Sequence, residues 1–103
     1  MAAAPPFVAY STATRAHVPA ARWPDVYGSL QALKGHVQEY PGCQRFDAFA
    51  AVSEEGVWID VYTTWDTVDQ LDVYLARGYT FERMLADLGL EDIARSETTE
   101  KIF

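Results

Sequence analysis

The chain has 103 residues, half of them hydrophobic, which is enough for one compact domain and too short for two ordinary ones. Acidic residues outnumber basic ones by 15 to 8, which gives a formal net charge of −7. This balance argues against nucleic acid and anionic membranes as partners, because no basic stripe is available to neutralise phosphates.

The first residues and the single cysteine bear on where the protein works. Residues 1–6 have no basic region and no long apolar run, so we expect a flexible tail rather than a signal peptide or membrane anchor, with one folded domain over residues 7–103. Cys43 is the only cysteine, so no internal disulfide can form, which is typical of a cytoplasmic protein. A small apolar filler is a simpler interpretation of Cys43 than a nucleophile.

The first part of the chain predicts a strand and then a helix. Residues 7–13 alternate in the way that is typical of a strand. Pro19 suits the first turn of a helix, and Pro24 is either tolerated there or marks the true first turn. Apolar residues then recur at helical spacing as far as the stop at Pro41-Gly42, and they are Trp23, Val26, Tyr27, Leu30, Leu33, Val37 and Tyr40.

The middle of the chain predicts an antiparallel hairpin. Residues 44–52 and 57–65 are rich in apolar and β-branched residues, and the polar turn Ser53–Gly56 separates them. In the second of these strands one face would carry Val57, Ile59, Val61, Thr63 and Trp65. The opposite face would carry Trp58, Asp60, Tyr62 and Thr64.

Two helical pieces follow the hairpin. Asp66 or Thr67 can cap the first piece, and Gly78 interrupts it. Thr80 can cap the second piece, which Gly89 ends. The apolar face of the first piece would consist of Val68, Leu71, Tyr74 and Leu75.

A last strand is expected around residues 93–102. The element order is then β-α-β-β-α-β, the ferredoxin-like arrangement of an α+β protein, with an antiparallel sheet and helices on one face. The other face still carries apolar residues. We expect that face to pack against the same face of a second copy, which makes the protein a homodimer.

Three short motifs lie along this predicted fold: a small turn before the second strand, a tryptophan and an acidic residue at the end of the third, and an apolar pair on the next helix. They are Pro41-Gly42-Cys43, Trp65-Asp66, and Leu71 with Leu75. This combination resembles the antibiotic biosynthesis monooxygenase (ABM) domain family of the dimeric α/β-barrel superfamily. The resemblance covers nearly the whole chain in element order. It implies a dimer whose subunits each bind a small apolar or aromatic ligand in a cleft between sheet and helices.

The family implies more than one activity. Some members oxidise polycyclic aromatic polyketides without metal or flavin, others bind and degrade haem, and others are isomerases or cyclases. The haem-degrading members use an axial His, a Trp and an Asn. Met84 and Tyr74 stand in the approximate places of the first two, and this chain has no Asn. The resemblance therefore favours a cofactor-independent monooxygenase or cyclase over a haem-degrading protein.

Cofactor-free oxidation of a phenol needs a pocket that holds the substrate, removes its proton and stabilises the anion near dioxygen. We expect Tyr62, Tyr74 and His36 to be catalytic, since histidine is the natural proton acceptor near neutral pH. Residues 77–85 form a candidate lid with a hinge at Gly78. The expected substrate-binding residues are Tyr10, Trp65, Tyr79, Phe81, Arg83 and Met84.

Each of these residues also has a simpler interpretation. Tyr62 and Tyr74 suit core or interface packing, and Trp65 suits a plug at a strand end. His36 stands off the main apolar stripe of its helix, as a solvent-facing histidine would. Arg83 can simply balance Glu82 or Asp87, and Met84 at helical spacing suits a core.

No metal and no other cofactor is expected. His17 and His36 are far apart with no matched carboxylates, and the chain has no phosphate-binding glycine loop. Two hypotheses stay open. An ABM-like enzyme acting on an aromatic or polyketide-like substrate predicts an open cavity with a few convergent polar groups. A non-catalytic ligand-binding or interaction domain predicts a cleft filled by its own side chains.

Overall fold

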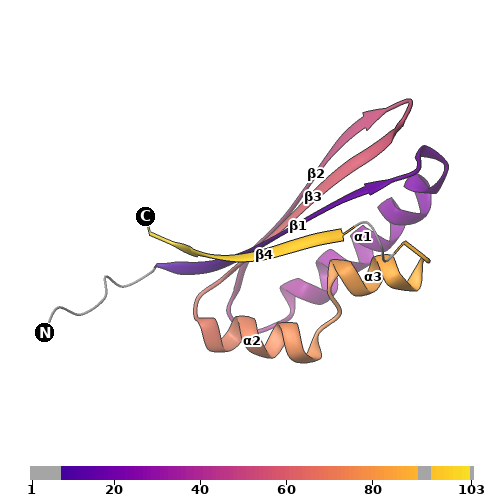
Figure 1. The fold of residues 1–103 in the computed structure, drawn as a ribbon. Helices are drawn as coiled ribbons and strands as arrows, with labels where there is room; N and C mark the ends of the chain where they lie inside the picture. Colours follow the sequence, from indigo (N-terminus) through magenta and orange to yellow (C-terminus); the bar gives the residue numbers. More distant parts are fainter. Residues whose placement is uncertain (1–7, 91–93, 103) are drawn as a thin grey trace, which may run out of the picture.

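The strands and helices follow the predicted order in a computed structural model, which describes residues 8–90 and 94–102 (Figure 1). The expected tail over residues 1–6, and the strand residues Phe7 and Ile93, lie outside the described residues. A 3-10 turn over Ala20–Arg22 precedes the first helix. The elements are β1 (Ala9–Val18), α1 (Trp23–Gln38), β2 (Cys43–Ser53), β3 (Gly56–Trp65), α2 (Val68–Arg77), α3 (Phe81–Asp87) and β4 (Ala94–Lys101).

The four strands form one antiparallel sheet in the order β2-β3-β1-β4. The helices α1, α2 and α3 all lie on the same side of this sheet (Figure 1). The arrangement is the ferredoxin-like α+β fold, so the predicted fold class is confirmed. None of the described elements covers the other face of the sheet, which we call the open face.

The central strand β1 is longer than the sequence pattern predicts. The predicted strand stopped at residue 13, whereas β1 continues to Val18 and pairs with β3 from Tyr10–Trp65 to Val18–Val57. It also pairs with β4 on its other edge. Thr14, Ala16 and Val18 are buried and alternate with the more exposed Arg15 and His17, but the pattern is weak in the sequence because threonine and alanine are polar or small. Pairing with β3 along this whole stretch, and with β4 as far as Ala16, makes it a strand.

The prolines and glycines fix where α1 begins and ends. Pro19 precedes the 3-10 turn, and Pro24 lies in the first turn of α1, so the second alternative for Pro24 is the observed one. After α1, Gly42 has a φ of 87°. A Cβ at Gly42 would lie 2.0 Å from the Oε1 atom of Gln70. The Pro-Gly stop therefore lets the chain turn and pass close to α2.

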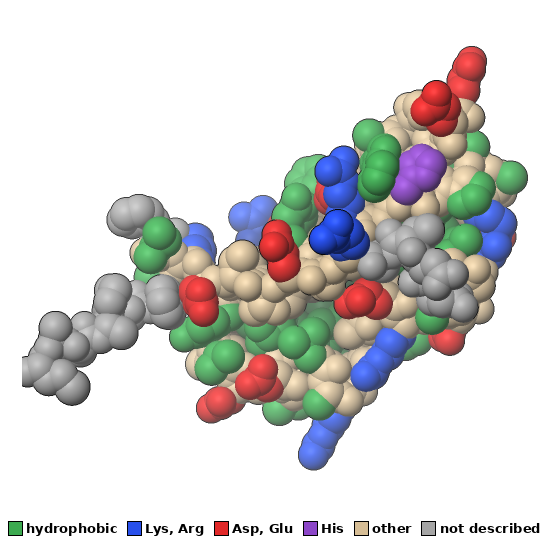
Figure 2. All heavy atoms as spheres, viewed as in Figure 1, with side chains coloured by type: hydrophobic (Ala, Val, Ile, Leu, Met, Phe, Trp, Pro, Cys, Tyr) green, Lys and Arg blue, Asp and Glu red, His purple; other side chains and the backbone are tan. Residues whose placement is uncertain are grey.

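The core fills the space between the sheet and the three helices. As predicted, β3 buries Val57, Ile59, Val61, Thr63 and Trp65. Of the predicted apolar face of α2, Leu71 and Tyr74 are buried. Val68 and Leu75 are 42% and 40% exposed. Figure 2 shows hydrophobic side chains at the surface over α2, next to acidic ones. Across the described residues, no helix has the length and apolarity needed to cross a membrane.

Two threonines cap the short helices: of the two alternatives for α2, Thr67 rather than Asp66 is the cap, and Thr80 caps α3 as predicted. The Oγ1 atom of Thr67 accepts the N–H of Gln70 at 3.2 Å, and the Oγ1 atom of Thr80 accepts the N–H of Arg83 at 3.2 Å. The predicted break at Gly78 is confirmed, since α2 ends before it and α3 begins after it. This break places a short non-helical junction, residues 78–80, over the sheet.

Candidate active site

The cleft that the sequence predicts would lie between the sheet and the α2–α3 region. Trp65 at the end of β3 is fully buried and stacks on Tyr74 of α2, with ring centroids 4.8 Å apart and planes 24° apart. The Nε1 atom of Trp65 donates to the Oγ1 atom of Thr63 at 2.8 Å, and Thr63 is hydrogen-bonded to Thr12. Buried aromatic and hydroxyl groups therefore form the sheet side of the cleft.

Tyr74 is held as a neutral hydrogen-bond donor. Its hydroxyl donates to the carbonyl oxygen of Tyr79 at 3.1 Å. Burial raises the pKa of the Tyr74 phenol well above its ordinary value, and the nearby Cys43 and Tyr40 add to the rise. At neutral pH Tyr74 can therefore donate a hydrogen bond but has no charge with which to take a proton.

His36 reaches the same junction from α1. Its Nε2 atom accepts the backbone N–H of Tyr79 at 3.0 Å, so the neutral ring carries its proton on Nδ1. The ring also meets Tyr40 edge-on, with centroids 5.3 Å apart. The half-buried His36 and the buried Tyr74 therefore hold the two backbone groups of Tyr79 between them. The accepting nitrogen of His36 becomes available to a substrate only when its bond to Tyr79 opens.

Arg83 closes the end of α2. Its guanidinium donates to the carbonyl oxygens of Gly78 at 2.6 Å and of Leu75 at 3.4 Å. Asp87, one of the two acidic residues that Arg83 could have balanced, accepts a hydrogen bond from the hydroxyl of Tyr79. That bond raises the pKa of the Tyr79 phenol. Three side chains, those of His36, Tyr74 and Arg83, thus hold the backbone of the junction in place.

The cleft has little free volume in this arrangement. Its cavity measures about 20 Å³, room for about one water molecule. The buried Tyr74 and Phe81 line this cavity, and the buried Trp65 and Met84 belong to the same hydrophobic core. A polycyclic ligand therefore enters only if the α2–α3 region moves. The wall of the cavity also carries polar side chains, which are Thr12, Thr14, Thr63, Thr80, Glu82 and Ser96.

Tyr62 and Tyr10 lie outside this constellation. Tyr62 is on the open face, exposed, with its ring 5.9 Å from that of Phe49. One protomer therefore brings Tyr74 and His36 to one junction but does not bring Tyr62 to them. Tyr10 is the register partner of Trp65 on β1 and packs at the edge of the core.

Sequence reasoning missed the hydroxyl groups of the cleft. Thr12, Thr14 and Thr63 are buried. One sequence feature does indicate a buried hydroxyl group, because Thr63 is a polar residue on the predicted apolar face of its strand. Cys43 fits the filler interpretation, because burial raises the pKa of its thiol and its Sγ atom donates to the carbonyl of Arg45.

Residues suited to hold a metal do not gather in the part of the chain that the structure describes. Over residues 8–90 and 94–102, no three or more His, Cys, Asp and Glu side chains come together as a possible ligand set. The side chains in and around the cleft offer aromatic rings, hydroxyl groups, the carboxylate of Glu82 and one histidine.

Solved structures with a similar fold include proteins named as antibiotic biosynthesis monooxygenases. A candidate antibiotic biosynthesis monooxygenase from Nitrosomonas europaea matches with a TM-score of 0.75 at 14% identity, over 95% of this chain and 94% of that chain. One from Caulobacter crescentus CB15 matches with a TM-score of 0.71 at 20% identity, over 94% and 92%. SnoaB, a cofactor-independent oxygenase from Streptomyces nogalater solved as a mutant, matches with a TM-score of 0.64 at 14% identity, over 90% of both chains.

Comparisons by sequence give no match. No protein-family model matches the chain, and no curated protein matches it significantly. At the identities of the solved structures, the likeness shows a shared fold and leaves the activity open.

Proposed function

We propose that this chain is an ABM-type enzyme that binds an aromatic, polyketide-like substrate between the sheet and the α2–α3 region, and oxidises or cyclises it without metal or flavin. The Trp65–Tyr74 stack, set beside buried hydroxyl groups and under the junction at residues 78–80, carries this proposal. The fold shared with a cofactor-independent oxygenase supports it. We place the enzyme in the cytoplasm, which suits a chain with one cysteine.

Substrate entry would begin at the junction. Opening the two hydrogen bonds that the Tyr79 backbone makes, its N–H donating to His36 and its carbonyl accepting from Tyr74, would release α3 from the sheet while leaving its Thr80 cap intact. Phe81, which lines the closed cavity, and Met84, which is buried on the same helix, would then line the open cleft. The lid proposed over residues 77–85 is therefore the region that must move.

Opening the junction also frees the groups that the chemistry needs. An aromatic substrate would lie against Trp65, and the Nε2 atom of His36, released from Tyr79, would accept the proton of its phenol. The neutral hydroxyl of Tyr74 would donate to the phenolate oxygen. Dioxygen then oxidises a neighbouring CH₂ group of the substrate. One oxygen atom forms the new C=O, and the other leaves as water with the two hydrogens of the CH₂ group.

We further propose a homodimer that forms through the open face. Phe49, Trp58 and Tyr62 are exposed there, and a second copy would bury them. In this arrangement Tyr62 acts at the contact between subunits. For Tyr62 to be catalytic, the partner subunit would have to complete a site around its side chain.

A non-catalytic ligand-binding or interaction domain is the second candidate. The observation in its favour is the cavity of about 20 Å³, since a cleft filled by its own side chains is what this hypothesis predicts. The two candidates differ in turnover, so an assay for product separates them.

The test is aerobic oxidation of 1,8-dihydroxyanthrone to its anthraquinone, followed by absorbance, with His36→Gln and the matched control His17→Gln. General base catalysis contributes about 10²–10⁴-fold, so H36Q should lower kcat at least about a hundredfold. H17Q, whose side chain lies on the open face beside Trp58, should behave as wild type.

Two results would count against the enzyme. Binding of the anthrone without any turnover by wild type would favour the ligand-binding domain. Equal turnover by H36Q and wild type would remove His36 from the proposed chemistry.

A further inference from the structure

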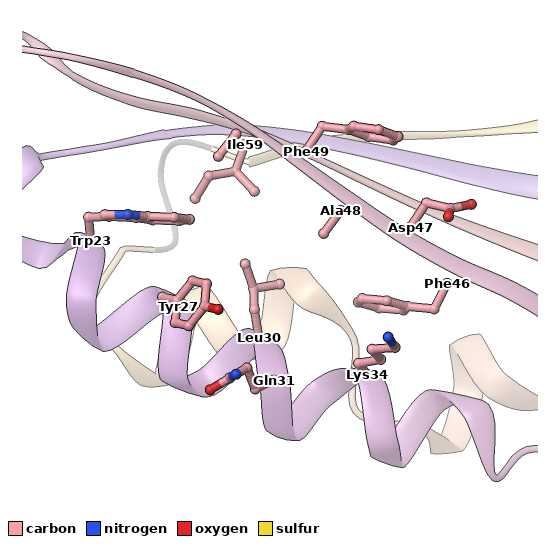
Figure 3. Close-up of a pocket in the computed structure, with 11 residues that line it drawn as sticks. Trp23, Tyr27, Leu30, Gln31, Lys34, Phe46, Asp47, Ala48, Phe49 and Ile59 are labelled. Atoms are coloured by element: carbon pink, nitrogen blue, oxygen red, sulfur yellow. The ribbon is translucent and has the colours of Figure 1, made fainter.

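A second groove lies between α1 and the edge strand β2, and it shares no lining residue with the cleft (Figure 3). Its volume is about 400 Å³, within the range of roughly 300–1,000 Å³ that is typical of small-molecule sites. Trp23 and Tyr27 lie at one end, Phe46 and Lys34 lie at the other, and Ala48 lies between them (Figure 3). The groove is thus large enough for a ligand in the structure as it stands.

The groove exists because β2 carries small side chains on its helix side. Ala48 and Ala50 pair with Val61 and Ile59 of β3 and point to the same face of the sheet. The two β3 residues are buried, whereas the two alanines are exposed. α1 therefore leaves a strip of β2 around these two alanines open. A large side chain at residue 50 would fill that strip.

The walls of the groove are aromatic and only partly covered. The rings of Trp23 and Tyr27 meet edge-on, with centroids 5.7 Å apart and planes 72° apart. Tyr27 is 53% exposed, although its ring has the apolar area of a core residue. A flat apolar molecule lying over the alanines would remove this surface from water, and that burial favours binding.

Lys34 brings a positive charge to the groove. Among the interactions of the described residues, Lys34 takes part in no ion pair. Asp47, a carboxylate that also lines the groove, is paired with Arg45 at 3.2 Å. The residues one helical turn from Lys34 are not acidic, and they are Leu30, Gln31, Val37 and Gln38. In a chain of net charge −7, this ammonium is left for an anionic partner.

We propose that the groove is a binding site for a flat aromatic molecule carrying one carboxylate. The rings of the ligand lie over Ala48 and Ala50, against Tyr27 and Phe46, and its carboxylate meets the ammonium of Lys34. The amide of Gln31, which also lines the groove, is placed to donate a hydrogen bond to the ligand. This site stands on its own residues, whether or not the cleft is catalytic.

The test is calorimetric titration of the full chain with 2-naphthoate and with its neutral counterpart 2-naphthalenemethanol. Ala50→Phe should abolish binding of both. Lys34→Met should weaken naphthoate about fivefold, the effect of one exposed ion pair, and leave the alcohol unchanged. Lys101→Met is the matched control, because Lys101 is the other lysine of the chain and lies on β4, and it should change neither titration.

Several outcomes would overturn the proposal. Unchanged naphthoate binding by A50F, or by a second filling variant Ala48→Leu that keeps a folded amide spectrum, would place the ligand elsewhere. Equal losses of naphthoate affinity in K34M and K101M would show that the net charge of the protein, and not a contact with Lys34, is responsible. A changed subunit number of A50F in sedimentation velocity would assign the groove to a contact between protein chains.

Discussion

A tyrosine in water ionises near pH 10, and its hydroxyl can donate or accept hydrogen bonds. Tyr74 keeps only part of this chemistry, because it is buried, stacked on Trp65 and hydrogen-bonded to the backbone of Tyr79. Its surroundings disfavour the charged form. At the scale of the residue, the site thus separates a donor, Tyr74, from the candidate base, His36.

Tyr74 should make the folded state sensitive to alkali. Its pKa is raised in the folded state, so the stability that its neutral form contributes is complete below pH 10 and is lost as the pH rises above 10. Tyr74→Phe should lack this part of the alkaline loss. At neutral pH it should lower the free energy of unfolding by about 1 kcal/mol, through the lost hydrogen bond.

Urea unfolding at pH 8 and at pH 10.5 measures this effect. Tyr62→Phe is the control, since Tyr62 is exposed on the open face. The same alkaline loss in Y74F as in wild type would show that another group is responsible.

The sequence indicated some site residues and not their partners. Trp65 and Tyr74 could be chosen because a strand end and a helix face predict that each points inward. The bond from His36 to Tyr79 spans 43 positions and depends on how α1 packs beside the junction. Residue type alone favours Tyr62 as a cleft residue, but the alternation of its strand puts Tyr62 on the opposite face from Trp65.

At the scale of the element, α2 and α3 depend on their ends. α3 has seven residues, too few to be stable as an isolated helix, so its cap and its contacts with the sheet must hold it. Both threonine caps were predictable, because a threonine before a helical pattern has a local role. The exposure of Val68 and Leu75 was not, because it depends on how far the sheet extends under α2.

Removing the cap of α3 should loosen the lid alone. Thr80→Ala should lower stability by about 1 kcal/mol and speed amide hydrogen exchange over residues 81–87. Thr67→Ala removes the matching cap of α2 and should speed exchange over residues 68–77 instead. Equal acceleration of both helices by T80A would mean that α2 and α3 open as one unit.

At the scale of the whole molecule, the order of the elements was enough to predict the ferredoxin-like fold. Few sheet arrangements accept two β-α-β halves with short connections. The length of β1 and the groove beside β2 could not be predicted, since both depend on which strands become neighbours. The open face carries Phe49, Trp58 and Tyr62 together with Arg15, whose guanidinium lies 4.5 Å from the ring centroid of Trp58.

If this face joins two copies, a charge placed in it should separate them. Trp58→Glu is expected to shift the protein toward monomer in sedimentation equilibrium, because a charged carboxylate would replace a large aromatic contact and would have to be buried between the two copies. Val73→Glu is the control, since Val73 is also exposed but lies on α2, on the helical side. A monomeric wild type, or a dimer that V73E rather than W58E disrupts, would contradict the open-face contact.

The position of β1 in the sheet also affects how the chain folds as it is synthesised. β1 is made early, yet one of its edges pairs with β4, with Ala9 opposite Lys101. Until β4 has left the ribosome, that edge presents unpaired backbone groups, which are prone to pair with other chains. The sheet is therefore completed only after translation of its last strand. Any shortened product that lacks β4 should be a substrate for chaperones and proteases rather than a folded protein.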